Sequence, residues 1–171
     1  MNRGQWLASY IGNNKAVGVE LGVLRGPTFK GLIKICPNLT LTGIDVFTPD
    51  RYWQANKITS TEELLKIEPL SWFDELLEFC REYPYRAHIR RDFTNKAHAN
   101  FEDGSLDFVF IDADHSMDAV DEDIRLWEPK VKKGGLVSGH DIDMLSVKMA
   151  VMNHNPQYEE GPDNVWYWKK E

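Results

Sequence analysis

A chain of 171 residues favours a single domain, 1–171, large enough to bury about two-thirds of the surface that its unfolded form exposes. The formal net charge of −7 argues against nucleic acid as a partner, because the overall field of such a protein does not attract a phosphate backbone. The first residues lack the apolar core of a signal peptide, and no apolar run approaches the roughly 20 residues of a membrane helix, so we expect a cytoplasmic protein that does not bind membranes.

The first predicted elements alternate between helices and short strands. Apolar side chains recur on one face of residues 3–11, which predicts a leading helix. An apolar strand at 16–21 runs into a turn with two glycines, and Pro27 suits the first turn of the helix that follows. Alternating apolar residues then predict a second strand at 39–45.

The middle of the chain has weaker signals. Ser60 and Glu63 have the spacing of a capping box and predict a short helix. Ser71 is expected to cap a longer helix with an apolar inner face. Cys36 and Cys80 have no metal-ligand spacing and fall on the apolar faces of predicted helices, so both are interpreted as reduced core residues.

The second half contains the strongest strand signal. A weak strand at 86–91 and a polar segment precede the apolar run at 106–111. An amphipathic helix is expected at 116–128, and the glycine pair at 134–135 is expected to turn the chain into a strand at 136–139.

The order of elements predicts the fold. A helix near 146–153 and an antiparallel hairpin around 161–162 close the chain. Strands that alternate with helices indicate an α/β, Rossmann-like, doubly wound fold, with a mainly parallel sheet, helices on both faces and a C-terminal antiparallel hairpin. In this architecture ligands bind beyond the carboxyl ends of the strands. The residues expected there are Glu20 to Gly26, Asp45, Asp92, Asp112 to His115, and His140-Asp141.

The loop after the first strand, "VELGVLRGPTF", indicates the charge of its ligand. Gly22 and Gly26 have the spacing G-x-x-x-G, which differs from the G-x-G-x-x-G of a dinucleotide site. Glu20 would repel a pyrophosphate, and the loop has no lysine to compensate, so this acid suits a cofactor that bears positive charge. Asp45, at the end of the second strand, is placed to accept both hydroxyls of a ribose.

A ribose together with a cationic group points to S-adenosylmethionine. A tight turn would explain the glycines alone, and a helix cap or a solvated acid would explain Asp45 alone. Their joint occurrence after consecutive strands favours the cofactor.

From residue 16 to about 150 the sequence resembles the class I S-adenosylmethionine-dependent methyltransferases. It is most similar to a small-molecule O-methyltransferase-like group with an "IDADHS…GG…GHD" pattern. The matching stretches are "VGVELGVLRGPTF", "LTGIDVF", "RRDFTNKAHANFEDGSLDFVFIDADHSMDAVDEDIRLWEPKVKKGG" and "LVSGHDID".

The resemblance implies roles for the residues at the strand ends. Glu20, Gly22 and Gly26 would line the methionine end of the cofactor, and Asp45 would hold the ribose. The prediction of a strand at 86–91 rests on the resemblance to the family. The same resemblance would place Asp92 and Phe93 beside the adenine. Asp112 is also expected to bind the cofactor.

A cluster of acids and histidines follows the last two parallel strands. Asp112 ends one strand and His140-Asp141 end the next, so their side chains should meet. Two oxygens and an imidazole nitrogen can hold a divalent ion with positions open for substrate. Such an ion would lower the pKa of a substrate hydroxyl, and Asp114 or His115 could take the proton.

The cluster also has other interpretations. His140 departs from the oxygen-only ligands of similar metal-dependent O-methyltransferases, and it favours manganese, iron or zinc over magnesium. Without a metal, His140 could itself be the base, or hydrogen-bond across the strand ends. Asp114 and Ser116 also suit the start of a helix, and the acids at 121–123 are interpreted as a solvated helix face.

The predicted function is methyl transfer from S-adenosylmethionine to a small-molecule acceptor. A hydroxyl oxygen is favoured over a nitrogen as the atom that is methylated. Residues 46–70 and 142–155 are expected to form most of the acceptor pocket, and Tyr52-Trp53 could cover the adenosine or the acceptor.

Two other functions stay open from the sequence. One is a metal-dependent hydrolase or oxygenase with Asp112, His140 and Asp141 as its ligands. The other is a module that binds the cofactor without catalysis. The aromatic tail at 166–168 could seal the core or pair with another subunit in a homodimer.

Overall fold

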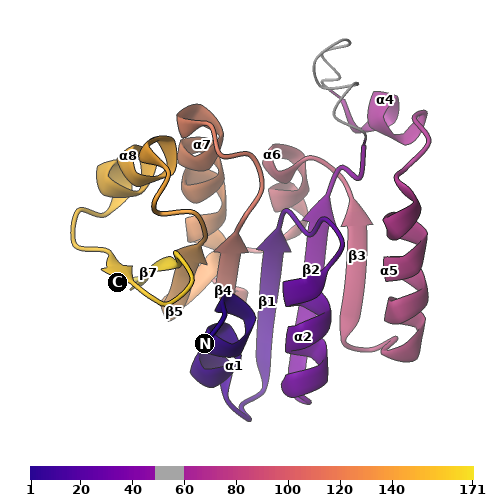
Figure 1. Ribbon diagram of the computed structural model, residues 1–171, viewed down its shortest axis with the longest axis horizontal. Coiled ribbons are helices and arrows are strands. Elements are labelled where there is room, and N and C mark those ends of the chain that lie inside the picture. Colours follow the sequence, from indigo (N-terminus) through magenta and orange to yellow (C-terminus); the bar gives the residue numbers. More distant parts are fainter. Residues whose placement is uncertain (49–59) are drawn as a thin grey trace.

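The computed structural model describes residues 1–48 and 60–171. In it the chain folds into a seven-stranded sheet between two layers of helices (Figure 1). The strand order is β3-β2-β1-β4-β5-β7-β6. The strands are β1 (Ala16–Leu21), β2 (Leu39–Asp45), β3 (Ala87–Arg91), β4 (Leu106–Ile111), β5 (Val131–Gly139), β6 (Glu159–Glu160) and β7 (Trp166–Lys169).

The first five strands are parallel, and the last two form the antiparallel hairpin. β1 lies at the centre, with β2 on one side and β4 on the other. The chain therefore winds outwards in one direction to β3 and then crosses back to β4, which makes the β1/β4 junction the switch point where ligands of such sheets bind. The predicted α/β doubly wound class and the C-terminal hairpin are confirmed.

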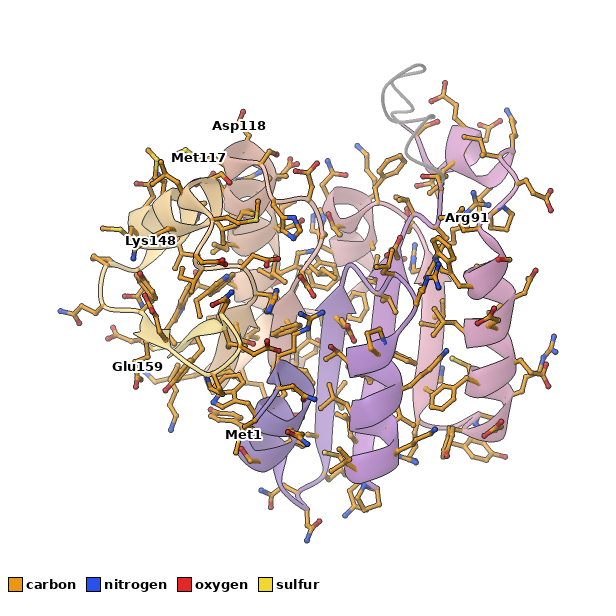
Figure 2. The ribbon with its side chains drawn as sticks, viewed as in Figure 1. Met1, Arg91, Met117, Asp118, Lys148 and Glu159 are labelled. Atoms are coloured by element: carbon orange, nitrogen blue, oxygen red, sulfur yellow. The ribbon has the colours of Figure 1, made fainter. Side chains whose placement is uncertain are left out.

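Helices cover both faces of the sheet. Their bounds are α1 (Arg3–Ile11), α2 (Pro27–Ile35), α4 (Thr61–Leu65), α5 (Ser71–Glu82), α6 (Thr94–Ala97), α7 (Met117–Trp127) and α8 (Leu145–His154), with 3₁₀ turns η1 (His98–Asn100) and η2 (Glu128–Lys130). α1, α2 and α5 share one apolar core with the sheet, and α6, α7 and α8 share the other. Figure 2 adds the side chains of the described residues to this arrangement. Because both faces are buried, β1 and β4 are apolar at every position except Glu20 and Asp107.

Local capping agrees with the sequence at one helix and not at another. The capping box of α4 is confirmed: Glu63 donates its backbone N–H to the Ser60 hydroxyl, and Ser60 donates its own to the Glu63 carboxylate. The predicted cap at Ser71 is wrong, because the cap position is Leu70 and Ser71 is the exposed first residue of α5.

Two segments differ from the prediction. The polar segment after β3 contains α6 and η1, whose only buried residue is Ala97, so no apolar periodicity announces them. The glycine pair does not turn the chain but lies inside β5. Gly134 takes a φ of +77°, a conformation that glycine adopts without strain, and the register between β4 and β5 shifts nearby.

The aromatic tail seals the core, one of its two predicted roles. Trp166 and Trp168 of β7 are buried and stacked, and Tyr167 lies 4.9 Å from Trp6 of α1 between ring centroids. None of the helices in the described part of the chain has the length and apolar character that crossing a bilayer demands.

Candidate active site

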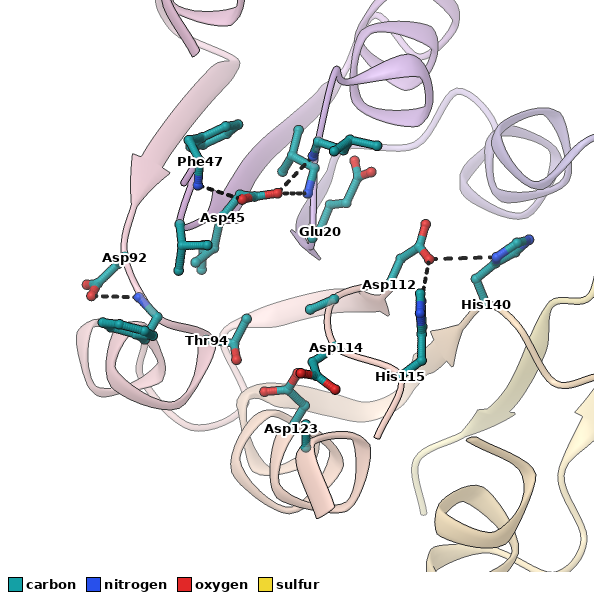
Figure 3. Close-up of a pocket in the computed structure, with 18 of the residues that line it drawn as sticks. Glu20, Asp45, Phe47, Asp92, Thr94, Asp112, Asp114, His115, Asp123 and His140 are labelled. Atoms are coloured by element: carbon teal, nitrogen blue, oxygen red, sulfur yellow. Dashed lines mark hydrogen bonds and ion pairs between the residues drawn. The ribbon is translucent and has the colours of Figure 1, made fainter. Parts of the chain in front are cut away.

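A cavity of about 950 Å³ opens over the carboxyl ends of the parallel strands (Figure 3). The predicted site residues that line it are Glu20, Gly22, Asp45, Asp92, Phe93, Asp112, Asp114, His115, His140 and Asp141. Gly26 does not line this cavity. It has a φ of +74° at the start of α2, and a Cβ there would lie 2.5 Å from the side chain of Leu76. The role that the structure shows for Gly26 is therefore to form the turn into α2.

Gly22 lets the loop after β1 pass directly against the end of β4. Its φ is +79°, and an added Cβ would lie 2.0 Å from the carbonyl oxygen of Asp112. Its backbone N–H donates to the carbonyl of Ile44 at 2.9 Å. Only glycine fits this position, which brings the ends of three strands together around one space.

Asp45 fixes the same loop from the side of β2. Its Oδ2 accepts backbone N–H groups of Val23 and Leu24 at 2.9 and 2.8 Å, and its Oδ1 accepts that of Phe47 at 2.8 Å. A carboxylate has about four acceptor positions, so one remains for a ligand while these bonds hold. The predicted grip on both ribose hydroxyls stays a prediction.

Glu20 is buried without a hydrogen-bond donor for one of its oxygens. The residue is 2% exposed, and Oε2 has no partner. Burial, with the nearby Asp112 carboxylate, raises the pKa of Glu20 well above its usual range, while the Arg3 charge opposes this. A buried acid with an unused oxygen is suited to a cationic group, as the sequence indicated.

Asp92 is engaged by the protein on both oxygens. Oδ1 accepts the hydroxyl of Thr61 at 2.7 Å and the backbone N–H of Phe93 at 2.9 Å, and Oδ2 accepts two guanidinium bonds from Arg90. Asp92 thus joins α4 to the end of β3. Its contact with an adenine amino group remains a prediction.

The acid–histidine cluster comes together as the strand order requires. Asp141 lies between the two rings, with Oδ2 at 2.9 Å from His115 Nε2 and Oδ1 at 3.0 Å from His140 Nδ1. Asp112 Oδ1 lies 3.8 Å from His115 Nε2 and 3.6 Å from His140 Nδ1. The Asp112 carboxylate, followed by the other acids nearby, raises the pKa of His115, and burial partly offsets this.

Arg3 of α1 enters this cluster, and the sequence reasoning missed it. Its Nη1 donates to His140 Nε2 at 3.0 Å, Nη2 lies 3.4 Å from Asp112 Oδ2, and Nε donates to the Thr28 hydroxyl at 3.1 Å. Arg3 precedes the first strand, so the rule that functional residues follow strands could not find it.

One arrangement in the described residues could hold a divalent ion. Ligand atoms of Asp112, His115 and Asp141 all lie within 4.8 Å of one another. The predicted set had His140 in place of His115, and in the structure the Nε2 of His140 accepts a hydrogen bond from Arg3.

The interpretation of residues 121–123 as a solvated face is wrong for Asp123. This residue of α7 is 2% exposed and lines the cavity beside Asp114 (Figure 3). Burial raises the pKa of Asp123 to about 7, with Glu122 and Asp114 adding to the effect and Thr94 opposing it. Asp114 is exposed, and its Oδ1 accepts the backbone N–H of Ser116 at 2.7 Å, as expected before a helix.

The expected acceptor segments are only partly found at the cavity. Val46, Phe47, Thr48 and Leu70 line it. No lining residue comes from 142–155, all of which the structure describes. Tyr52 and Trp53 lie outside the described residues.

Comparison with known proteins shows the family to which the chain belongs. Residues 19–142, from β1 to just after β5, match the family model described as a methyltransferase domain. The chain belongs to this methyltransferase family. The family implies S-adenosylmethionine as the methyl donor, and it decides against the hydrolase or oxygenase alternative. The comparison with curated proteins gave no match.

Solved methyltransferase structures share the architecture. The O-methyltransferase NovP is 20% identical, with a TM-score of 0.64 over 98% of this chain and 77% of that one. The calicheamicin methyltransferase CalS11 is 15% identical, with a TM-score of 0.64 over 97% and 76%. A Staphylococcus aureus protein described as a caffeoyl-CoA O-methyltransferase is 16% identical, with a TM-score of 0.65 over 98% and 82%. Identities this low establish the fold alone.

Proposed function

We propose that this methyltransferase transfers the methyl group of S-adenosylmethionine to a hydroxyl oxygen of a small molecule. The observation that carries the proposal is one cavity that holds both the buried acid Glu20, whose Oε2 has no partner, and an acid–histidine cluster at the ends of β4 and β5. Structural neighbours named as O-methyltransferases, NovP among them, support the choice of oxygen.

The residues on the β1 side of the cavity suit the cofactor. S-adenosylmethionine, when bound, supplies a methyl group on a positively charged sulfur. Glu20 offers a free carboxylate oxygen for the ammonium group of its methionine part. Asp45 retains one acceptor position for the ribose, and Asp92-Phe93 form the wall where the resemblance expects the adenine.

The residues on the β4–β5 side suit deprotonation of the acceptor. We assign the general base to His115, because its Nε2 faces the carboxylates of Asp141 and Asp112. The charge of these carboxylates favours the proton on Nε2, which has no hydrogen-bond partner of its own, and leaves Nδ1 to take the hydroxyl proton. His140 is already engaged by Arg3, and Asp114 by the start of α7.

A divalent ion is the second device that the cluster supports. Held by Asp112, His115 and Asp141, it would polarise the acceptor oxygen, and His115 would then be a ligand and not the base. Dialysis against EDTA separates the two devices. Activity that survives EDTA supports the base, whereas activity that is lost and returns with manganese or zinc supports the metal.

Calorimetric titration with S-adenosylhomocysteine tests the cofactor. We expect the wild-type chain to bind it, and Asp45→Ala to weaken binding at least about tenfold, because the variant loses both the ribose acceptor and the anchor of the loop. Absence of binding by the wild type would overturn the proposed function.

Methyl transfer to a panel of phenols and sugars, compared with the matching amines, then tests the preference for oxygen.

A further inference from the structure

Arg3 is the only lysine or arginine among the described residues that line the cavity. The acidic residues that line it are Glu20, Asp45, Asp92, Asp112, Asp114, Glu122, Asp123 and Asp141. A space with so many acids attracts positive groups and repels negative ones.

The methyl donor carries groups of both signs. Its sulfonium and ammonium suit the acids, but its methionine part also ends in a carboxylate, which these acids would repel. We propose that Arg3 binds this carboxylate, so that the N-terminal helix α1 supplies a cationic contact to the cofactor site. This inference rests on the proposed function.

The position of Arg3 fits this role. It lines the same cavity as Glu20, the residue assigned to the ammonium, so the two groups of one amino acid can each meet an opposite charge there. The Nε bond to the Thr28 hydroxyl of α2 aims the guanidinium into the cavity, and α1 packs against α2. The capping box of Asn2 and Gln5 fixes the turn of α1 that carries Arg3.

The guanidinium also retains capacity for a ligand. Its contact with Asp112 is 3.4 Å, longer than the roughly 2.7–2.9 Å of a good charged hydrogen bond. The remaining partner of its two terminal nitrogens is the ring of His140. Because each terminal nitrogen carries two N–H groups, an incoming carboxylate can form the two parallel bonds that arginine makes to carboxylates while His140 keeps its bond from Nη1.

The test compares two ligands that differ only in the carboxylate. S-adenosylhomocysteine and its decarboxylated analogue are titrated into wild type, Arg3→Gln and Arg3→Lys by calorimetry. We expect Arg3→Gln to weaken S-adenosylhomocysteine about 10- to 100-fold and to leave the decarboxylated analogue unchanged. Arg3→Lys should restore part of the loss, because it returns the charge without the planar fork.

Lys34→Gln is the matched control. Lys34 is exposed on α2 and outside the cavity lining, so this change removes one positive charge and should leave both affinities unchanged. Unchanged affinity of Arg3→Gln for S-adenosylhomocysteine would overturn the inference, as would equal losses for the two ligands, which would mean that Arg3 acts on the fold. If the wild type binds neither ligand, it is the proposed function that fails.

Discussion

Gly22 determines how closely the loop after β1 approaches the end of β4. Its positive φ and the 2.0 Å between a hypothetical Cβ and the Asp112 carbonyl oxygen leave no space for a side chain. The clash would be with backbone, which cannot rotate away as a side chain can.

We therefore expect Gly22→Ala to destabilise the protein by at least about 2 kcal/mol and to abolish S-adenosylhomocysteine binding. Denaturant unfolding and calorimetry measure the two effects. Gly31→Ala is the control, because Gly31 lies in α2 with no atom near its missing Cβ, and it should gain about 0.5–1 kcal/mol. Equal effects of the two changes would contradict the steric argument.

His115 gives a prediction about pH. A base must be unprotonated to accept a proton, and the neighbouring carboxylates raise the pKa of His115. The rate should therefore rise with pH, with its midpoint above the usual value of about 6.5 for histidine. His115→Gln should lose about 10²- to 10⁴-fold in kcat and lose this rise, while still binding S-adenosylhomocysteine.

Two variants make the assignment of His115 specific. Asp141→Asn removes one of the charges that raise the pKa, so the midpoint should move to lower pH. His154→Gln removes a histidine paired with Asp121 outside the cavity and should change neither rate nor profile. A profile that His115→Gln leaves intact would return the role of base to His140 or Asp114.

At the scale of elements, α4 depends on a tertiary contact for its stability. It has only five residues, too few to form a stable helix alone. Its attachments are the buried Leu64 and the hydroxyl of Thr61, which donates to Asp92 at 2.7 Å. The stability of this short helix therefore depends on its hydrogen bond to Asp92 at the end of β3, where the adenine is expected.

Thr61→Val should remove that attachment with little change of shape. We expect faster amide exchange across 61–65 and a loss of about 1–2 kcal/mol, because a hydrogen bond to a charged group is removed. Thr61→Ser keeps the hydroxyl and should retain most of the protection. Equal exchange rates in the two variants would mean that the methyl group, and not the hydrogen bond, holds α4.

Elements with regular apolar spacing could be predicted from the sequence, and elements held by other forces could not. β1, β4 and α7 bury continuous or periodic apolar side chains, and their predicted bounds lie within one residue of those observed. The helical segment 94–100 buries only Ala97, so its sequence carries no such signal. The glycine pair of β5 predicts a turn on local grounds, but it lies where the register between β4 and β5 shifts, and its backbone is hydrogen-bonded to Lys170, just after β7.

Residues from the helices on both faces of the sheet line the cavity. Strand ends could be predicted as site positions because every parallel strand ends at the same edge of the sheet. Arg3 and Asp123 could not, since they come from α1 and α7 on opposite faces and reach the cavity only through packing. Sequence periodicity says that these helices pack against the sheet but not which of their polar residues point into the site.

The buried Asp123 should make the stability of the whole protein depend on pH. Its pKa is raised to about 7 in the folded chain, against about 3.9 in an unfolded one. Between these values the folded state holds a proton that the unfolded state has released. Stability should therefore fall as pH rises from about 4 to 7, and the full cost, on the order of 1–4 kcal/mol, is present above pH 7.

Asp123→Asn keeps the shape of the side chain and removes its charge. The variant should be more stable than wild type at pH 8, and the difference should shrink toward zero near pH 4, as measured by denaturant unfolding at a series of pH values. Asp118→Asn, at the exposed start of the same helix (Figure 2), should keep the wild-type dependence on pH. If the curves of Asp123→Asn and wild type stay parallel from pH 4 to 8, Asp123 titrates as an ordinary surface acid, and its burial against the cavity has no energetic consequence.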